Sequence, residues 1–370
     1  MRKIAILYLG RRGAGPIYAY EMARALSKEN NIFAVLSSYT ENKSAWDSEV
    51  QINKNLSIKY VNTYTSMPSF LLSSLNLFRF IEIIRSINLY SPDIFYSPME
   101  HFWDAVIYPF VRCKLKIKTI HDVKLHKQED SFAYRFFHWF TFRQADKYVI
   151  LSKKFTQNLI NKGIKKQNII HIPHANFSYY SNEKENRDFY FNNKILFFGR
   201  ILEYKGLHVL LKAMKIVVKN MPNIKLVIAG DGNISPYKND IDILHDNIEL
   251  HNEWISIEDV KIYFKDIDVV VLPYIQASQS GVIPLAYSFS KPVIVSNTGA
   301  LDEQMYDGKT GYLIEPHNHK MLAERILYLM SSPDMIYRMS KECYKVYKNE
   351  LTWEASAKKF MESLCNWEDL

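Results

Sequence analysis

Two cations stand in a short turn between a predicted strand and a predicted helix, in the stretch ILFFGRILEYKG at residues 195–206. The apolar run that opens the stretch is typical of a buried strand in a parallel sheet, and it stops at Gly199. Arg200 and Lys205 follow, and Gly206 precedes apolar residues at helical spacing. In an open α/β sheet, such a turn lies beyond the carboxyl end of the strand, where the next helix directs its positive N-terminus. A diphosphate would suit this turn, because Arg offers two parallel hydrogen bonds, Lys a mobile charge and the helix free N–H groups.

Two further motifs favour this interpretation over the alternative, in which Arg200 and Lys205 are solvated loop charges. AGDG ends the next predicted strand at residues 229–232, and SGVIPLAYSFSKPVIVSNTGA follows at residues 280–300. The ordered set of strand-GR-x4-KG, strand-GDG and G-x2-PLA-x5-PVI resembles the C-terminal half of the family 4 retaining glycosyltransferases, also called glycosyl transferases group 1. The resemblance implies the GT-B fold, in which two Rossmann-like, doubly wound domains face each other across a cleft. It also implies a C-terminal helix that crosses back to the N-terminal domain.

The composition fits a globular protein of two domains in a reducing compartment. The chain has 370 residues, 48% of them apolar, which is enough for two cores. Three scattered cysteines are too few for a disulfide framework or a zinc site. No signal peptide is expected, because only a short apolar run follows Met1, and residues 70–90 carry three charges and are not expected to span a membrane. We therefore expect a cytoplasmic protein.

The N-terminal half is strongly basic, with 25 Lys and Arg against 13 Asp and Glu in residues 1–180. Within it, residues 124–147 mix five cations with seven Phe, Tyr and Trp side chains and His138. Three interpretations are open: a core helix with a basic face, a helix on an anionic membrane surface, or a nucleic-acid surface. The last is disfavoured because nothing resembles a nucleic-acid motif. Peripheral contact with the inner face of the cell membrane is the partner interaction that the basic half suggests.

Short apolar runs alternate with helical patterns along both halves, which predicts an α/β fold with mostly parallel sheets. The expected strands are 4–9, 32–36, 94–96, 116–120, 148–151, 169–172, 195–198, 224–229, 248–250, 269–272 and 293–295. The expected N-terminal helices are 17–26, 70–87, 132–143 and 153–161, and the chain looks helical from residue 318 onwards. The expected division is an acceptor-binding domain at 1–176, a polar linker at 177–193, a nucleotide-sugar domain at 194–350 and a returning helix at 351–370.

A glycine-rich turn and a histidine mark the carboxyl ends of two N-terminal strands. Gly13 and Gly15 follow the first strand, and the turn is not a full G-x-G-x-x-G, so a dinucleotide site is not expected. It is either an ordinary tight turn or, as the resemblance implies, a loop that faces the sugar and the acceptor. His121 and Asp122 close another strand and either move a proton or cap the following helix. The family often has a histidine there, near the transferred sugar, which favours His121.

The resemblance assigns the remaining donor contacts residue by residue. It implies that Arg200 and Lys205 bind the diphosphate while Gly199 and Gly206 shape the turn. Asp231 and Gly232 would line the nucleotide crevice. Trp254 and Ile255 stand where the family lays the nucleobase, although a buried aromatic anchor is an equal alternative for Trp254.

The chain departs from the family pattern at two positions. The resemblance implies a glutamate at each, with seven residues between them, and here Ser278 and Ala286 replace them. Ser278, Gln279 and Ser280 would supply neutral hydrogen bonds to the donor sugar instead, and N–H groups near Gly281 still face its oxygens. The variant is interpreted as an active subclass, with weakened catalysis as the alternative.

No metal or cofactor is expected. Two D-x-D spacings occur, at 240–242 in a polar loop and at 266–268 before a strand, and the second is interpreted as a cap. The cations at Arg200 and Lys205 would replace a metal ion.

The predicted function is transfer of a sugar, with retention, from a UDP- or GDP-linked nucleotide donor to a hydroxyl of a growing surface glycan. A lipid-linked glycan is one form that this acceptor could take. Arg200 and Lys205 would stabilise the leaving diphosphate, and His121 would orient the sugar or the acceptor. The alternatives are a nucleotide-sugar epimerase, a glycan phosphorylase, and a non-catalytic protein that senses nucleotide sugars or serves as a scaffold.

Overall fold

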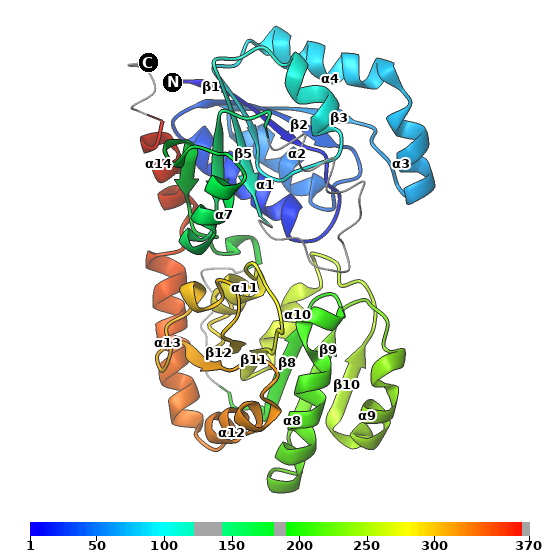
Figure 1. Ribbon diagram of the computed structural model, residues 1–370, viewed down its shortest axis with the longest axis vertical. Coiled ribbons are helices and arrows are strands. Elements are labelled where there is room, and N and C mark those ends of the chain that lie inside the picture. Colours follow the sequence, from blue (N-terminus) through cyan, green and yellow to red (C-terminus); the bar gives the residue numbers. More distant parts are fainter. Residues whose placement is uncertain (122–142, 181–189, 365–370) are drawn as a thin grey trace. The chain divides into compact units, whose positions relative to one another are not determined.

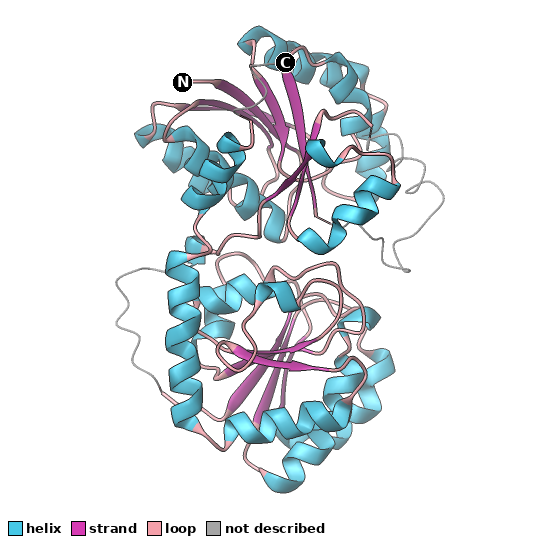
Figure 2. Ribbon diagram, turned by 60° about the vertical axis from the view of Figure 1, so that its left-hand side comes forward, coloured by secondary structure: helices cyan, strands magenta, loops and turns pink. Residues whose placement is uncertain are grey.

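The chain folds into two units, each built around a parallel sheet with helices on both faces (Figures 1 and 2). The structure is a computed structural model that describes residues 1–121, 143–180 and 190–364. The N-terminal unit comprises Met1–Pro173 with Trp353–Leu370, and the C-terminal unit comprises His174–Thr352. The predicted α/β fold of two Rossmann-like domains is confirmed.

The N-terminal unit has seven strands in the order β3-β2-β1-β4-β5-β6-β7, all parallel. Its strands are β1 (Lys3–Tyr8), β2 (Asn31–Ser37), β3 (Leu56–Val61), β4 (Ile94–Ser97), β5 (Leu115–Ile120), β6 (Lys147–Ile150) and β7 (Ile169–His171). Its described α-helices are α1 (Ala14–Ser27), α2 (Lys43–Ile52), α3 (Met67–Ser74), α4 (Leu77–Tyr90), α5 (Asp104–Ile107), α7 (Thr156–Asn161) and α14 (Trp353–Glu362). The central strands β1 and β4 are buried on both faces, which explains their continuous apolar runs.

The C-terminal unit has six parallel strands in the order β10-β9-β8-β11-β12-β13. Its strands are β8 (Lys194–Phe198), β9 (Lys225–Ala229), β10 (Ile248–His251), β11 (Val269–Leu272), β12 (Val293–Ser296) and β13 (Gly311–Ile314). Its α-helices are α8 (Leu207–Asn220), α9 (Lys238–Ile243), α10 (Val260–Lys265), α11 (Val282–Ser288), α12 (His319–Met330) and α13 (Pro333–Asn349). β8 lies at the middle of this sheet, so the turn after β8 has a neighbouring strand end on each side.

The helix at the C-terminal end of the chain returns to the N-terminal unit, as predicted. α14 packs on α1, where the rings of Trp353 and Tyr18 meet edge to face with centroids 5.0 Å apart. Lys28 Nζ also lies 2.7 Å from Glu354 Oε1. The aromatic contact and the ion pair thus fix a sequence-distant helix on the first helix of the chain.

Three expectations about secondary structure were wrong or incomplete. The single helix expected at 70–87 is two helices, α3 and α4, bent by 74° where Asn76 accepts a hydrogen bond from Arg79 N and restarts the helix. The sequence patterns did not indicate β3 or β13, each of which lies at one edge of its sheet and lacks a continuous buried run. Asp240 and Asp242 lie in α9 rather than in a loop.

No single helix among the described residues is both long and apolar enough to cross a membrane, although the bent pair α3 and α4 passes that test jointly by composition. Most of residues 124–147, and Asp122, lie outside the described residues.

Candidate nucleotide-sugar site

The turn after β8 brings the two predicted cations close together. Gly199 has φ of +102°, and a Cβ atom placed on it would stand 2.9 Å from Lys205 Nζ, so the ammonium lies directly over this glycine. Gly206 has φ of +72° and precedes α8, and a Cβ there would stand only 1.9 Å from the carbonyl oxygen of Pro273. Both positions therefore require glycine, and both shape the path of the chain around Lys205.

Lys205 has an electrostatic environment that would favour an anion. Burial, followed by the charge of Arg200, lowers the pKa of the Lys205 ammonium to about 8. The ammonium lies 5.3 Å from the centroid of the buried Tyr274 ring, and within the described ranges it forms no ion pair with a carboxylate. Arg200 is exposed beside it. A phosphate between the two cations would relieve their repulsion and raise the pKa of Lys205 again.

The turn after β9 is joined to the turn after β8 by close backbone contact. Gly199 N donates to Ala229 O over 2.9 Å, and Ile201 N donates to Asp231 O over 2.8 Å. A Cβ on Gly230 would stand 2.2 Å from Gly199 O, and one on Gly232 would stand 2.4 Å from Ile201 O. The predicted GDG motif thus has a structural reason of its own, which is the close approach of two strand ends. The Asp231 side chain is exposed at this edge of the sheet.

The region predicted to hold the nucleobase follows β10. Gly232 N lies 3.2 Å from Asn252 Oδ1, which ties the turn after β9 to the chain just before Trp254. Trp254 is 37% exposed, so the alternative of a buried aromatic anchor does not describe it. Ile255 is half-buried beside it. The carboxyl ends of β8, β9 and β10 therefore form one continuous edge that carries Arg200, Asp231 and Trp254.

The serine-rich loop before α11 is held in place by a glutamine that sequence reasoning missed. Gln304 Oε1 accepts from Ser280 N over 2.8 Å, and Gln304 Nε2 donates to Ser280 O over 3.0 Å. Ser280 Oγ also lies 3.4 Å from the Tyr274 hydroxyl. Tyr274 therefore contacts both Lys205 and this loop. Tyr274 follows closely on the end of strand β11, and this position was a usable sequence signal. Gln304 is 24 residues from Ser280 in the chain, and no pattern linked the two.

Ser278 and Ala286, the two positions at which the resemblance implied glutamates, are buried. Ser278 is 1% exposed and Ala286 is fully buried, which is an environment for small neutral side chains. Gln279 Oε1 is a buried oxygen for which no hydrogen-bond donor is found among the described residues. Gly281 lies near His174 Nε2, 3.7 Å from the point that a Cβ on the glycine would occupy. His174 is buried, and its burial lowers its pKa to about 4, so it is neutral at physiological pH.

In the N-terminal unit, the predicted residues are placed at the carboxyl edge of the sheet, each with a local contact. His121 Nε2 lies 2.8 Å from the carbonyl oxygen of Pro98, and its ring meets Tyr18 edge to face at 4.8 Å. Because a carbonyl only accepts, Nε2 carries a proton. Gly13 has φ of +83°, and its N–H donates to Glu41 Oε2 over 3.4 Å.

Gly15 has a packing reason. A Cβ there would stand 2.6 Å from the Tyr8 hydroxyl and 2.7 Å from Met99 Sδ, so these side chains fill the space beside it. The interpretation of this turn as an ordinary tight turn therefore explains Gly15 without a ligand.

Neither predicted D-x-D spacing has the surroundings of a metal site. Asp240 pairs with Lys215 Nζ at 2.6 Å, and Asp268 accepts from the backbone N–H groups of Asn192 and Lys194. Over the ranges that the structure describes, no group of three His, Cys, Asp or Glu side chains could hold a metal ion.

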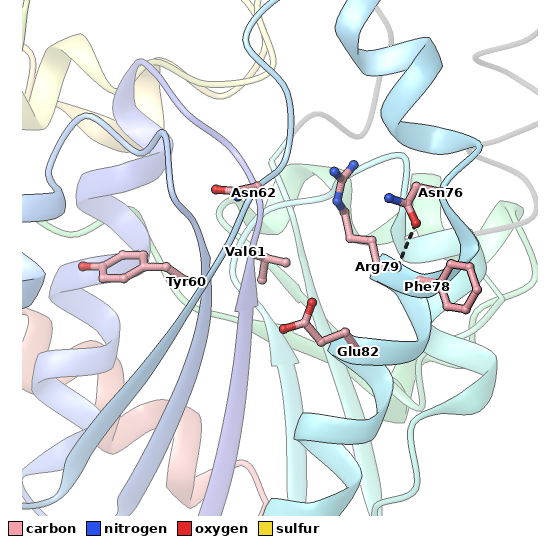
Figure 3. Close-up of a pocket in the computed structure, with 7 residues that line it drawn as sticks. All are labelled: Tyr60, Val61, Asn62, Asn76, Phe78, Arg79 and Glu82. Carbon is pink, nitrogen blue, oxygen red and sulfur yellow. Dashed lines mark hydrogen bonds between the residues drawn. The ribbon is translucent and has the colours of Figure 1, made fainter.

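One pocket of about 300 Å³ lies away from all of these residues, in the N-terminal unit between the end of β3 and the start of α4. Figure 3 shows Arg79 and Glu82 reaching into the gap between the two elements. It contains none of the predicted site residues.

The fold is shared with solved structures of other proteins. The HepE protein of Anabaena, solved with UDP-glucose, superposes with a TM-score of 0.73 at 16% identity, covering 98% of this chain and 99% of that one. A TarM mutant of Staphylococcus aureus, solved with UDP and two glycan ligands, superposes with a TM-score of 0.71 at 12% identity over 99% of this chain and all of that one. At identities this low, the superpositions establish the fold alone, which is GT-B.

Residues 192–332 match the family described as glycosyl transferases group 1.

Three curated proteins are similar to this chain in sequence. An uncharacterized glycosyltransferase of Methanocaldococcus jannaschii is 27% identical over 249 residues, 65% of this chain and 67% of its own. The D-inositol 3-phosphate glycosyltransferase of Paenarthrobacter aurescens is 32% identical over 131 residues, 34% of this chain and 32% of its own. A capsular polysaccharide biosynthesis glycosyltransferase of Staphylococcus aureus is 27% identical over 172 residues, 44% of each chain. The matches thus span between a third and two thirds of the relatives' lengths.

Proposed function

We propose that this protein is a retaining glycosyltransferase that moves a sugar from a nucleotide-sugar donor to a hydroxyl of a growing cell-surface glycan. The observation that carries the proposal is the pair Arg200 and Lys205, which repel each other at the carboxyl end of β8 and would be neutralised by a diphosphate. The donor is a UDP- or GDP-linked sugar. UDP is favoured because the superposed HepE and TarM structures hold UDP or UDP-glucose. The surface-glycan acceptor is supported by the relative that is named for capsular polysaccharide biosynthesis.

In the proposed reaction, Arg200 and Lys205 stabilise the negative charge that develops on the departing diphosphate. Losing one well-placed donor of this kind costs on the order of 3 kcal/mol, about a hundredfold or more in rate. The two cations act without a metal ion. Trp254 and Ile255 contact the base, Asp231 and Gly232 line the nucleotide crevice, and the loop from Ser278 to Gly281 contacts the sugar.

His121 is proposed to orient the sugar or the acceptor hydroxyl. Its Nε2–H is engaged by Pro98 O, which fixes the orientation of the ring. His121→Ala is therefore expected to lower the transfer rate while leaving UDP affinity unchanged.

The first test is a thermal-shift panel with UDP, GDP, ADP and CMP and their common sugar conjugates. A ligand at about a hundred times its Kd stabilises the folded state by roughly 2.7 kcal/mol, which shifts the melting temperature by several degrees. Arg200→Ala and Lys205→Met should lose the shift, while Lys219→Met, at the far end of α8, should keep it. Equal shifts in all four proteins would overturn the assignment of the diphosphate site.

The second test measures release of free nucleotide in the presence of candidate glycan acceptors, at the cytoplasmic pH and with a chelator present. Acceptor-dependent release supports the transferase, and dependence on added divalent metal would overturn the proposal that the two cations suffice. Binding without any release favours the second candidate function, a nucleotide-sugar-binding scaffold of a glycan assembly pathway. The buried neutral residues Ser278 and Ala286, where the family usually has glutamates, are the observation behind that candidate. In either role we place the protein in the cytoplasm, in peripheral contact with the inner face of the membrane.

A further inference from the structure

An unusually apolar surface covers the bend between α3 and α4 in the N-terminal unit. Six large side chains there are exposed by more than half: Leu71 64%, Leu72 72%, Leu75 78%, Leu77 67%, Phe78 84% and Ile81 57%. We call these six residues the α3–α4 apolar surface. Single exposed apolar residues are ordinary, whereas a contiguous group of this size marks an interaction site.

These side chains are not part of the core. α3 has no buried residue at all, and α4 buries only Phe80, Ile83 and Ile87, on the face turned toward the unit. Figure 1 shows both helices along the outer side of the N-terminal unit. The helix pair therefore presents a second apolar face, opposite the one that the fold uses.

Hydrogen bonds hold the bend in a fixed shape. Ser73 Oγ donates to Thr63 O over 2.8 Å, and Trp103 Nε1 donates to Ser74 Oγ over 2.8 Å. Arg79 Nη1 donates to Ser73 O over 3.1 Å, across the break. The polar side chains of the bend thus point to the unit and anchor it, while the leucines point outward.

The charges around the surface fit an anionic partner. Between residues 62 and 90 there is one carboxylate, Glu82, which pairs with Lys59 at 2.9 Å, against the cations Arg79 and Arg85. Residues 1–180 carry 25 Lys and Arg against 13 Asp and Glu. A second copy of the chain would bring two basic halves together, whereas a bilayer with anionic headgroups attracts them.

The composition of the pair also fits a lipid phase. α3 and α4 together meet the hydropathy criterion of a membrane span, yet the 74° bend between them prevents a straight crossing. An apolar helix pair with such a bend can lie in the interface of a bilayer, with leucine and phenylalanine side chains at the boundary of the acyl chains.

We propose that the α3–α4 apolar surface docks this protein on an anionic phospholipid bilayer, with both helices in the plane of the interface. Phe78, Leu75 and Leu77 insert most deeply, since they lie at the bend. Arg85 contacts the headgroups. The inference names the surface behind the membrane contact included in the proposed function, but it does not depend on sugar transfer. Its test therefore needs neither donor nor acceptor.

The experiment is flotation of the full chain with vesicles of 70% phosphatidylcholine and 30% phosphatidylglycerol, compared with vesicles of phosphatidylcholine alone. We expect the wild type to float with the anionic vesicles and at least fivefold less with the neutral ones. Leu72→Gln/Phe78→Gln should reduce the bound fraction at least tenfold. The matched control Ile243→Gln/Ile262→Gln, which removes two exposed isoleucines from the C-terminal unit, should bind like the wild type.

A second variant and a second measurement keep the result clear. Leu71→Gln/Leu75→Gln changes other members of the surface and should give the same loss, and thermal melting of all variants checks that they fold. Unchanged flotation of two folded surface variants overturns the proposal. So does a wild type that ignores the vesicles and sediments as a dimer that the same substitutions dissociate, since the surface would then bind a second copy. The UDP thermal shift should be the same in every variant, so loss of docking and loss of donor binding are separate outcomes.

Discussion

The ammonium of Lys205 lies over the backbone of Gly199, 2.9 Å from the point where a side chain on that glycine would begin. The Lys205 ammonium thus occupies the space that a side chain at position 199 would need. The two residues lie at the two ends of one turn, and Arg200 lies in the turn between them. The glycine keeps the ammonium close to the strand end, where burial and Arg200 lower its pKa to about 8. Conformation at Gly199 and charge at Lys205 are therefore coupled.

The coupling predicts the effect of adding one methyl group. Gly199→Ala forces a Cβ into the space of the ammonium and should lower UDP affinity at least tenfold in titration calorimetry. The substitution also places alanine at positive φ, which costs roughly 1–2 kcal/mol of stability by itself. Gly308→Ala is the matched control in the same unit, because Gly308 has φ of +73° and nothing within 4 Å of its Cβ position. Equal affinity losses in both variants would show that strain, rather than displacement of Lys205, is responsible.

The lowered pKa of Lys205 predicts a pH dependence of nucleotide binding. A diphosphate favours the charged ammonium, so UDP affinity should be highest below pH 8 and fall by up to tenfold per pH unit above it. At pH 8.5 the complex should take up part of a proton, measured as a binding enthalpy that depends on the ionisation heat of the buffer. Lys205→Met should abolish both effects, and Lys219→Met should abolish neither. A wild type whose affinity is flat from pH 7 to 9.5 contradicts the prediction.

The same group affects stability with the opposite sign. The unfolded chain has an ordinary lysine with a pKa near 10.4, so between about pH 8 and 10.4 the unfolded state binds more protons than the folded one. The cost of burying the charge is fully present below pH 8 and disappears as the pH rises through this window. The unfolding free energy of the wild type, relative to Lys205→Met, should therefore rise between pH 7.5 and 10 in urea titrations. A relative stability that falls over this range would show that Lys205 is favourably paired.

The sequence was sufficient for the central strands and for the turn after β8, because both depend on local residue types. A run such as VVVL at β11 indicates a buried strand. Glycine followed by two cations before a helix indicates a turn at the end of a strand. β3 and β13 could not be predicted this way, since only the two end residues of each strand are buried and their stability comes from pairing with a neighbour. The hydrogen bond between Gln304 and Ser280 could not be predicted either, because contacts between two loops follow no fixed sequence spacing. The break at Asn76 was missed because hydrophobicity continues through it, and only the side-chain cap ends one helix and starts the next.

Gln304 gives a prediction about the sugar part of the donor. Gln304→Ala removes two hydrogen bonds to Ser280 and should release the loop that is proposed to contact the sugar. Each bond contributes about 1 kcal/mol, so unfolding should become easier by about 2 kcal/mol. We expect the affinity for UDP to change less than twofold while the extra affinity for the UDP-sugar falls at least threefold. Gln304→Glu keeps only the hydrogen-bond acceptor, so its affinity for the UDP-sugar should lie between those of the wild type and Gln304→Ala. A loss of affinity that is equal for UDP and UDP-sugar would argue against a specific role of the loop.

The buried pair Lys118 and Asp104 predicts a large effect on the strand that carries His121. Lys118 Nζ lies 3.4 Å from Asp104 Oδ2 and 4.0 Å from the centroid of the Tyr108 ring, and both charged side chains are buried. Burial raises the pKa of Asp104, and Lys118 opposes this shift. Lys118→Met leaves a buried carboxylate alone, which should cost about 3–5 kcal/mol of unfolding free energy in urea.

Two controls separate the unpaired charge from lost packing. Lys118→Met/Asp104→Leu removes both charges and should recover most of the stability. In the single variant, burial raises the pKa of Asp104 above its value in the unfolded chain, and of the two groups that oppose this shift only the hydrogen bond from His101 N remains. The folded state then binds the extra proton, so the loss relative to the wild type should be smaller at pH 5 than at pH 7.5. A loss that is independent of pH, or a double variant no more stable than the single one, would mean that Lys118 contributes by packing on Tyr108 rather than by its charge.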